Sequence, residues 1–277
     1  MKKVLIVLLA GMLILTACAP SQPAATSGPN VETVVAATLQ ALTAAAPSPT
    51  VQSSGLPVSY NNVSFNIPLE LNASATPSTN TDVEFPYINP SNGPMPEHVV
   101  FQFTNYPVQG EARIMVFKAS EYAAYGTPVQ DAVTALLAKQ DATQPLPDAL
   151  LYSDIYALAK PVLFQNGHGV RYVIKPDTAI APITNQDIFY YFMGVTNDGA
   201  YFVSAIFHVN TSFLVADGSQ DSPTPPDGIP FNWGADLDFA KYRAEITQKL
   251  NDTPAENYAP SLTALDKMIE SLQVTNP

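Results

Sequence analysis

Apolar and polar residues alternate most regularly just after a long stretch of small and polar residues. Apolar side chains take every second position over 63–67, and a shorter piece of the same kind covers 58–60. Period-two alternation is typical of a strand that buries one face. The pattern therefore predicts two short strands joined through Asn61-Asn62.

Six further apolar segments are predicted as strands: Val99 to Thr104, Ala112 to Ala119, Val162 to Phe164, Val170 to Lys175, Asp187 to Thr196 and Ala200 to Val209. The last two are apolar on both faces, which is typical of central strands covered on both sides. Asn166-Gly167 and Asn197-Asp198-Gly199 tolerate positive φ, so they predict tight antiparallel connections. Segments 72–96 and 210–234 are rich in polar residues and proline and are predicted as long irregular loops.

Helical spacing of apolar residues predicts three helices, over 128–141, 236–250 and 261–272. The first follows Thr127-Pro128, a capping residue and a proline suited to the first helical position. Asp236 and Asp238 favour the N-terminal end of the second helix because of its dipole. The predicted fold is α+β, with an antiparallel sheet of about six strands and helices packed on it. A single folded domain is predicted over 57–277.

The first eighteen residues have the layout of a secretory signal, with two lysines followed by an apolar run over 4–15. This run is shorter than the roughly 20 residues that a membrane-spanning helix needs. Leu15-Thr16-Ala17-Cys18 resembles the lipobox of bacterial lipoproteins, in which the cysteine thiol is acylated and becomes the new N-terminus. The resemblance implies a covalent lipid such as palmitate on Cys18 and an extracytoplasmic membrane location. The alternative is an ordinary signal peptide in which Cys18 is incidental.

Residues 19–56 are mostly Ala, Pro, Ser, Thr and Gln with almost no charge. Such a composition buries too little apolar surface to offset the entropy of ordering. We interpret the segment as a tether, with a reach of roughly 35 Å as a flexible coil. Within it, residues 31–46 form either a transient helix or a small helix for packing or self-association.

The negative charge of the chain limits the kinds of molecule that it is expected to bind. The protein has 277 residues and a formal net charge of −12, and removing residues 1–18 takes away two lysines and no acid, which leaves −14. So acidic a surface disfavours nucleic acid and anionic lipid headgroups. With its single cysteine assigned to lipid, the chain has none left for a disulfide, a metal or nucleophilic catalysis.

Residues with catalytic chemistry are few and scattered. His98, His168 and His208 are widely spaced and form no HExxH pair. Ser204 lies within a predicted strand rather than in a nucleophile elbow. Satisfied or solvated histidines are therefore the simpler interpretation, and a metal site built from them is the alternative.

Two features of the loop over 210–234 are candidate sites. Asp217, Asp221 and Asp227 offer oxygen ligands for a hard cation but do not match an EF-hand, so they are weak candidates for metal beside a solvated acidic loop. Phe231 and Trp233 precede the second predicted helix. They predict either a surface that contacts a ligand or partner, or a pair that fastens the loop to the core.

The order of predicted elements is similar to the PsbP/Mog1-like α/β sandwich over roughly 58–275. A first strand at Val63–Pro68 comes before a strand pair, a Pro-capped helix, an antiparallel meander and a closing helix that ends in the segment 265–274. Members of such folds mostly bind other proteins or assist their assembly, and no functional residue is carried over. We therefore predict a non-enzymatic lipoprotein that needs no cofactor beyond its lipid and binds an envelope protein or glycan. An extracytoplasmic hydrolase with a dispersed site is the alternative, and solute capture for a transporter is a third.

Overall fold

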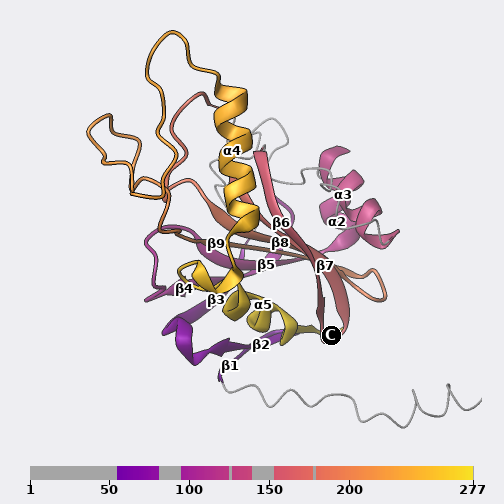
Figure 1. Cartoon of the computed structure of the whole chain (residues 1–277). Coiled ribbons are helices and arrows are strands. Elements are labelled where there is room, and N and C mark those ends of the chain that lie inside the picture. The colour runs from indigo at the N-terminus through magenta and orange to yellow at the C-terminus, as the bar shows by residue number, and fades with distance from the viewer. Residues whose placement is uncertain (1–54, 81–94, 125–126, 139–152, 177–178, 277) are drawn as a thin grey trace, which may run out of the picture. The chain divides into compact units, whose positions relative to one another are not determined.

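The computed structural model describes residues 55–80, 95–124, 127–138, 153–176 and 179–276 (Figure 1). The predicted lipobox and the helix over 31–46 lie outside these residues. The first described strand begins at Gly55. The last two residues of the predicted tether therefore belong to the folded region.

A seven-stranded antiparallel sheet forms the centre of the fold, in the spatial order β3-β4-β5-β9-β8-β7-β6. Its strands are β3 (Ser74–Asn80), β4 (His98–Thr104), β5 (Ala112–Lys118), β6 (Ser153–Phe164), β7 (Gly167–Pro176), β8 (Phe189–Thr196) and β9 (Tyr201–His208). The predicted α+β class and the antiparallel meander are confirmed. The predicted number of strands was one too low for this sheet, and β6 is much longer than the three residues predicted for it.

A second, three-stranded sheet has the order β1-β2-β10. It comprises β1 (Gly55–Tyr60), β2 (Val63–Pro68) and β10 (Gln273–Val274). The turn between β1 and β2 contains Asn61 with φ of 51°. The asparagines at this position therefore mark the hairpin as predicted, because asparagine tolerates the left-handed conformation.

The described helices are α2 (Ala119–Ala123), α3 (Thr127–Leu137), α4 (Phe239–Asp252) and α5 (Leu262–Glu270), with 3₁₀ turns η1 (Leu69–Leu71) and η3 (Ala255–Asn257). The helices predicted over 236–250 and 261–272 are confirmed as α4 and α5. Asp238 caps α4 by accepting from the backbone N–H of Lys241, and Ser261 caps α5 by accepting from that of Ala264. The first predicted helix is confirmed as α3, whose last helical residue is Leu137 rather than Asp141.

Both faces of the main sheet are covered, as the apolar character of β8 and β9 predicts. On one face, Phe207 of β9 belongs to a core that includes Phe65 of β2, Ile246 of α4 and Leu265 of α5. On the other, Phe202 stacks on Tyr122 of α2 at 4.5 Å between ring centroids. In Figure 1, α4 and α5 lie in front of the strands, away from α2 and α3.

The prediction of an irregular loop over 72–96 is wrong in its first part, because residues 74–80 form β3. This strand is made of Ser, Ala, Thr, Pro and Asn, and it lies at the edge of the sheet, paired only with β4. Small and polar residues suit an edge strand that faces water, but they carry no local strand signal. Helix α2 and strand β10 were also missed, and residues 81–94 lie outside the described part.

Each longer edge strand carries a proline. Pro57 lies in β1, Pro77 in β3 and Pro161 in β6, and all three strands are outermost in their sheets. Proline lacks the N–H that another strand would bind, so it blocks edge-to-edge association. The remaining edge strand, β10, is only two residues long.

Gly169 and Gly194 lie opposite each other on β7 and β8, and the ring of Phe192 covers both. A Cβ at Gly169 would lie 2.2 Å from the carbonyl oxygen of Met193 and 2.5 Å from the Phe192 ring. We therefore expect Gly169→Ala to lower the free energy of unfolding by about 1–3 kcal/mol, as overpacked cores do. Urea denaturation measures this change.

Gly218→Ala is the matched control for this substitution, because a Cβ at Gly218 meets nothing within 4 Å. Its free energy of unfolding should stay the same or rise by up to about 1 kcal/mol. Equal losses in the two variants would contradict the steric explanation.

Candidate functional site

Phe231 and Trp233 form an aromatic pair on the loop that leads into α4. Their ring centroids are 4.9 Å apart in an edge-to-face arrangement, and Phe231 meets Tyr242 of α4 in the same way at 5.1 Å. Phe231 is half-buried, whereas Trp233 is 50% exposed. Phe231 thus fastens the loop to the core, and Trp233 remains available at the surface.

The loop that carries this pair is held at several points. Asn185 binds the backbone of Thr211 through both polar atoms of its amide, and it also donates to the carbonyl of Leu214. Further along, the ammonium group of Lys249 donates to the carbonyl of Asp227. These bonds hold the loop at Thr211, Leu214 and Asp227. Beyond these points, the contact of Phe231 with Tyr242 supports the backbone next to Trp233.

The three aspartates of the same loop are not gathered around a common point. Asp217 accepts hydrogen bonds from the hydroxyl of Ser222 and the backbone N–H of Ser219, which lower the pKa of its carboxyl. Within the described ranges, no group of three or more His, Cys, Asp or Glu residues is arranged to hold a metal ion. That Asp217, Asp221 and Asp227 belong to a solvated acidic loop rather than to a metal site stays a prediction.

The three histidines occupy separate places in the sheet. His208 accepts from the backbone N–H of Glu111 through Nδ1 at 2.9 Å, and its Nε2 lies 2.7 Å from the carbonyl oxygen of Gln186. This pairing requires the neutral tautomer protonated on Nε2. Burial lowers the pKa of His208, and both ring nitrogens are occupied. It is a structural residue.

His98 and His168 also have local partners. Nδ1 of His98 lies 2.8 Å from the carbonyl oxygen of Pro96, and its ring stacks on Phe117. Burial lowers the pKa of His98 as well. His168 places Nε2 3.0 Å from the carbonyl oxygen of Leu136. These contacts favour the simpler of the two interpretations for His168 and His208, whereas Nε2 of His98 is buried without a hydrogen-bond partner among the described residues.

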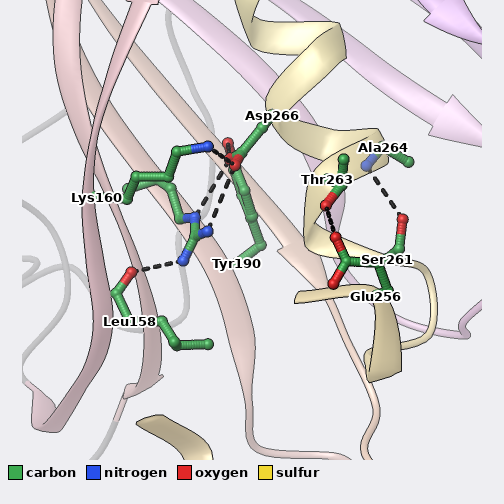
Figure 2. Close-up of polar contacts among 9 residues, drawn as sticks. Leu158, Lys160, Tyr190, Glu256, Ser261, Thr263, Ala264 and Asp266 are labelled. Carbon is green, nitrogen blue, oxygen red and sulfur yellow. Dashed lines mark hydrogen bonds and ion pairs between the residues drawn. The ribbon is translucent and has the colours of Figure 1, made fainter. Parts of the chain in front are cut away.

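The carboxylate of Asp266, on α5, is buried and binds three side chains of the main sheet (Figure 2). The ammonium group of Lys160 lies 2.8 Å from Oδ2, and Nε of Arg171 lies 3.2 Å from Oδ1. Tyr190 donates its hydroxyl to Oδ1 at 3.1 Å, and burial raises the pKa of this tyrosine. Because donors from β6, β7 and β8 meet one helix residue, the cluster fastens α5 to the sheet.

A bulge in β6 completes this cluster. Leu158 has φ of 51° within an irregularity of the β6–β7 pairing. Its carbonyl oxygen accepts from Arg171 at 2.5 Å, and its N–H donates to the side chain of Asn251 on α4. Bulges commonly redirect backbone groups in this way. Donors already occupy both oxygens of Asp266, so the cluster is a structural fastening rather than an open reactive site.

A cleft of about 460 Å³ lies at one end of the main sheet, beside the β1–β2 turn and the C-terminal segment. Its polar lining includes Asn61, Asn62, Thr79, Glu97, Lys118 and Tyr201. Among the described residues, one histidine and no serine or aspartate line it, so these residues do not form a Ser-His-Asp triad. Neither this cleft nor Asp266 was among the candidate sites predicted from the sequence.

Comparison with known protein families, with curated proteins and with solved structures found no match. The likeness to the PsbP/Mog1-like sandwich therefore rests on the order of elements and stays a prediction. Among the described helices, none is long and apolar enough to cross a membrane.

Proposed function

We propose that this protein is a non-enzymatic lipoprotein, anchored through Cys18 to the extracytoplasmic face of a bacterial membrane, that binds an envelope protein or glycan. The observation that carries the binding part is the exposed Trp233, braced by Phe231 on a supported loop. Rigid aromatic side chains at the surface contribute much of the binding energy at interfaces, because little entropy is lost when they are covered.

The position of the loop suits such a role. In Figure 1, β1, where the chain leaves the predicted tether, lies at the opposite end of the fold from the loop that enters α4. The loop is therefore far from the strand at which the predicted tether joins the domain. This arrangement supports a partner that is not the anchoring membrane itself.

The charge of the chain supports a neutral or basic partner. The mature chain has a formal charge of −14, which repels acidic proteins and anionic polymers at long range. A neutral glycan that stacks on Trp233, or a protein with a basic rim, avoids this repulsion.

Replacing Trp233 by alanine should weaken partner binding by more than about tenfold, since loss of an interface hot spot costs about 2 kcal/mol or more. The measurement is the retention of envelope proteins and glycans on the full chain, immobilised in detergent. Leu163→Ala is the matched control, because Leu163 is 70% exposed but lies on β6.

Loss of a specific partner with Trp233→Ala but not with Leu163→Ala supports the proposal. Retention of nothing by the wild-type chain, or equal retention by both variants, would show that the aromatic loop is not a binding surface.

A further inference from the structure

The cleft at the end of the main sheet has one wall that is fixed by hydrogen bonds between distant parts of the chain. The side chain of Asn62 donates to the carbonyl of Thr275 at 2.7 Å, and the N–H of Thr275 donates to the carbonyl of Asn62 at 2.8 Å. Asn61 donates to the hydroxyl of Thr79 on β3 at 3.3 Å. The wall is thus assembled before any ligand arrives.

The same contacts leave acceptors on this wall. Asn61 and Asn62 each use their side-chain nitrogen, so their Oδ1 atoms have no protein partner among the described residues. Side-chain carbonyl oxygens accept hydrogen bonds and donate none. A ligand that reaches this wall is recognised by its own N–H or O–H groups.

The charged side chains in and beside the cleft are those of Glu97, Lys118 and Glu121. Lys118 pairs with Glu121 at 2.9 Å, which raises the pKa of the lysine. Glu97 has no hydrogen bond or ion pair within the described part of the chain. Glu97 also interacts electrostatically with Lys118. Two carboxylates, those of Glu97 and Glu121, therefore lie around one lysine, so the charge at this end of the sheet is negative.

We propose that this cleft binds a small organic molecule that carries a primary ammonium group. The carboxylate of Glu97 supplies the opposite charge, and the carbonyl oxygens of Asn61 and Asn62 accept further N–H groups. Val99 and Val116 line the same cleft and suit the aliphatic part of the ligand. The site is separate from the aromatic loop, so it does not depend on the function proposed for that loop.

Size and long-range charge agree with this assignment. A volume of about 460 Å³ lies within the roughly 300–1,000 Å³ of small-molecule pockets. The net charge of −12 attracts cations towards the protein, and an anionic ligand would be repelled.

The test is calorimetric titration of the full chain in detergent with cadaverine, a linear aliphatic diamine, and with the uncharged diol of the same length. We expect cadaverine to bind at least about tenfold more tightly than the diol, since one charge-assisted hydrogen bond accounts for such a factor. Glu97→Gln should weaken cadaverine binding by about the same factor. Asp221→Asn, which removes an exposed acid from another loop, should leave it unchanged.

Lys118→Gln tests whether the cleft favours a positively charged ligand. Removing the lysine leaves the carboxylate of Glu121 without its ion pair and makes the cleft more negative, so cadaverine should bind more tightly. The proposal would be overturned if cadaverine did not bind at millimolar concentration, or if it bound no more tightly than the diol. It would also be overturned if Lys118→Gln weakened the binding of cadaverine, or if Glu97→Gln and Asp221→Asn weakened it equally.

Discussion

Asp266→Asn should lower the free energy of unfolding by about 3–5 kcal/mol, the usual cost of removing one partner from a buried ion pair. The substitution keeps the size of the side chain but removes the charge opposite Arg171, whose side chain is 4% exposed. A guanidinium left without its counter-charge in this position cannot reach water. Chemical denaturation followed by circular dichroism measures the loss.

Lys160→Gln is the control that shows whether the loss of stability depends on the burial of the ion pair or only on the loss of a charge. Lys160 binds the same carboxylate at 2.8 Å, but its side chain is 49% exposed. An ion pair with such a solvated partner is worth about 1 kcal/mol or less, so the loss should be correspondingly small. Similar losses for Lys160→Gln and Asp266→Asn would contradict the account.

A double variant separates two quantities: the loss of stability when one buried charge is left without its partner, and the net contribution of the ion pair to stability. Arg171→Met together with Asp266→Leu removes both charges of the buried pair and replaces them by apolar side chains, while the hydroxyl of Tyr190 loses its acceptor. Because buried pairs gain little over well-packed apolar residues, the double variant should be more stable than Asp266→Asn alone.

The parts of the fold that could be predicted are those in which neighbouring residues already carry the pattern. β8 and β9 are apolar at nearly every position, and this alone indicates central strands covered on both faces. The caps Asp238 and Ser261 lie next to the helices they begin, so the starts of α4 and α5 were predictable to within about three residues.

The parts that could not be predicted depend on contacts between distant residues. β3 becomes a strand because β4 pairs with it, and its own sequence has no large apolar residue at alternate positions and includes Pro77 and Asn80, which strands disfavour. The wall of the cleft joins Asn62 to Thr275, which are 213 positions apart. No pattern among neighbouring residues predicts such a pair.

Asp266 is an intermediate case, since its neighbours in the sequence already indicate that its side chain is buried but do not indicate its partner. Leu262, Asp266 and Ile269 share one face of α5, and all three are buried. An acidic residue at helical spacing between two apolar ones predicts a buried carboxylate, which requires a basic partner. Choosing Arg171 as that partner requires the fold, because two other strands also carry basic residues near buried positions.

The aromatic loop was found as a pair of candidates with two open interpretations. In the structure, each residue takes one of them: Phe231 packs on Tyr242, and Trp233 stays half exposed. Contact of Trp233 with a partner stays a prediction.

Cys18→Ala should abolish covalent lipid on the protein. The chain has one cysteine, so no other thiol takes its place. Feeding a bacterial expression host with an alkyne-bearing palmitate analogue should label the wild-type chain and leave Cys18→Ala unlabelled. Ser21→Ala lies just beyond the cleavage position predicted before residue 18, and it should be labelled like the wild type.

Mass spectrometry of the mature N-terminus decides between the two kinds of signal peptide. A lipoprotein begins at residue 18 and carries the mass of its acyl groups there. Two or more acyl chains hold it on the membrane, at ~0.8 kcal/mol per buried CH₂. An unmodified N-terminus at any other residue would mean that Cys18 is incidental. The acidic chain would then have no anchor of its own, and the aromatic loop would have to meet its partner from solution.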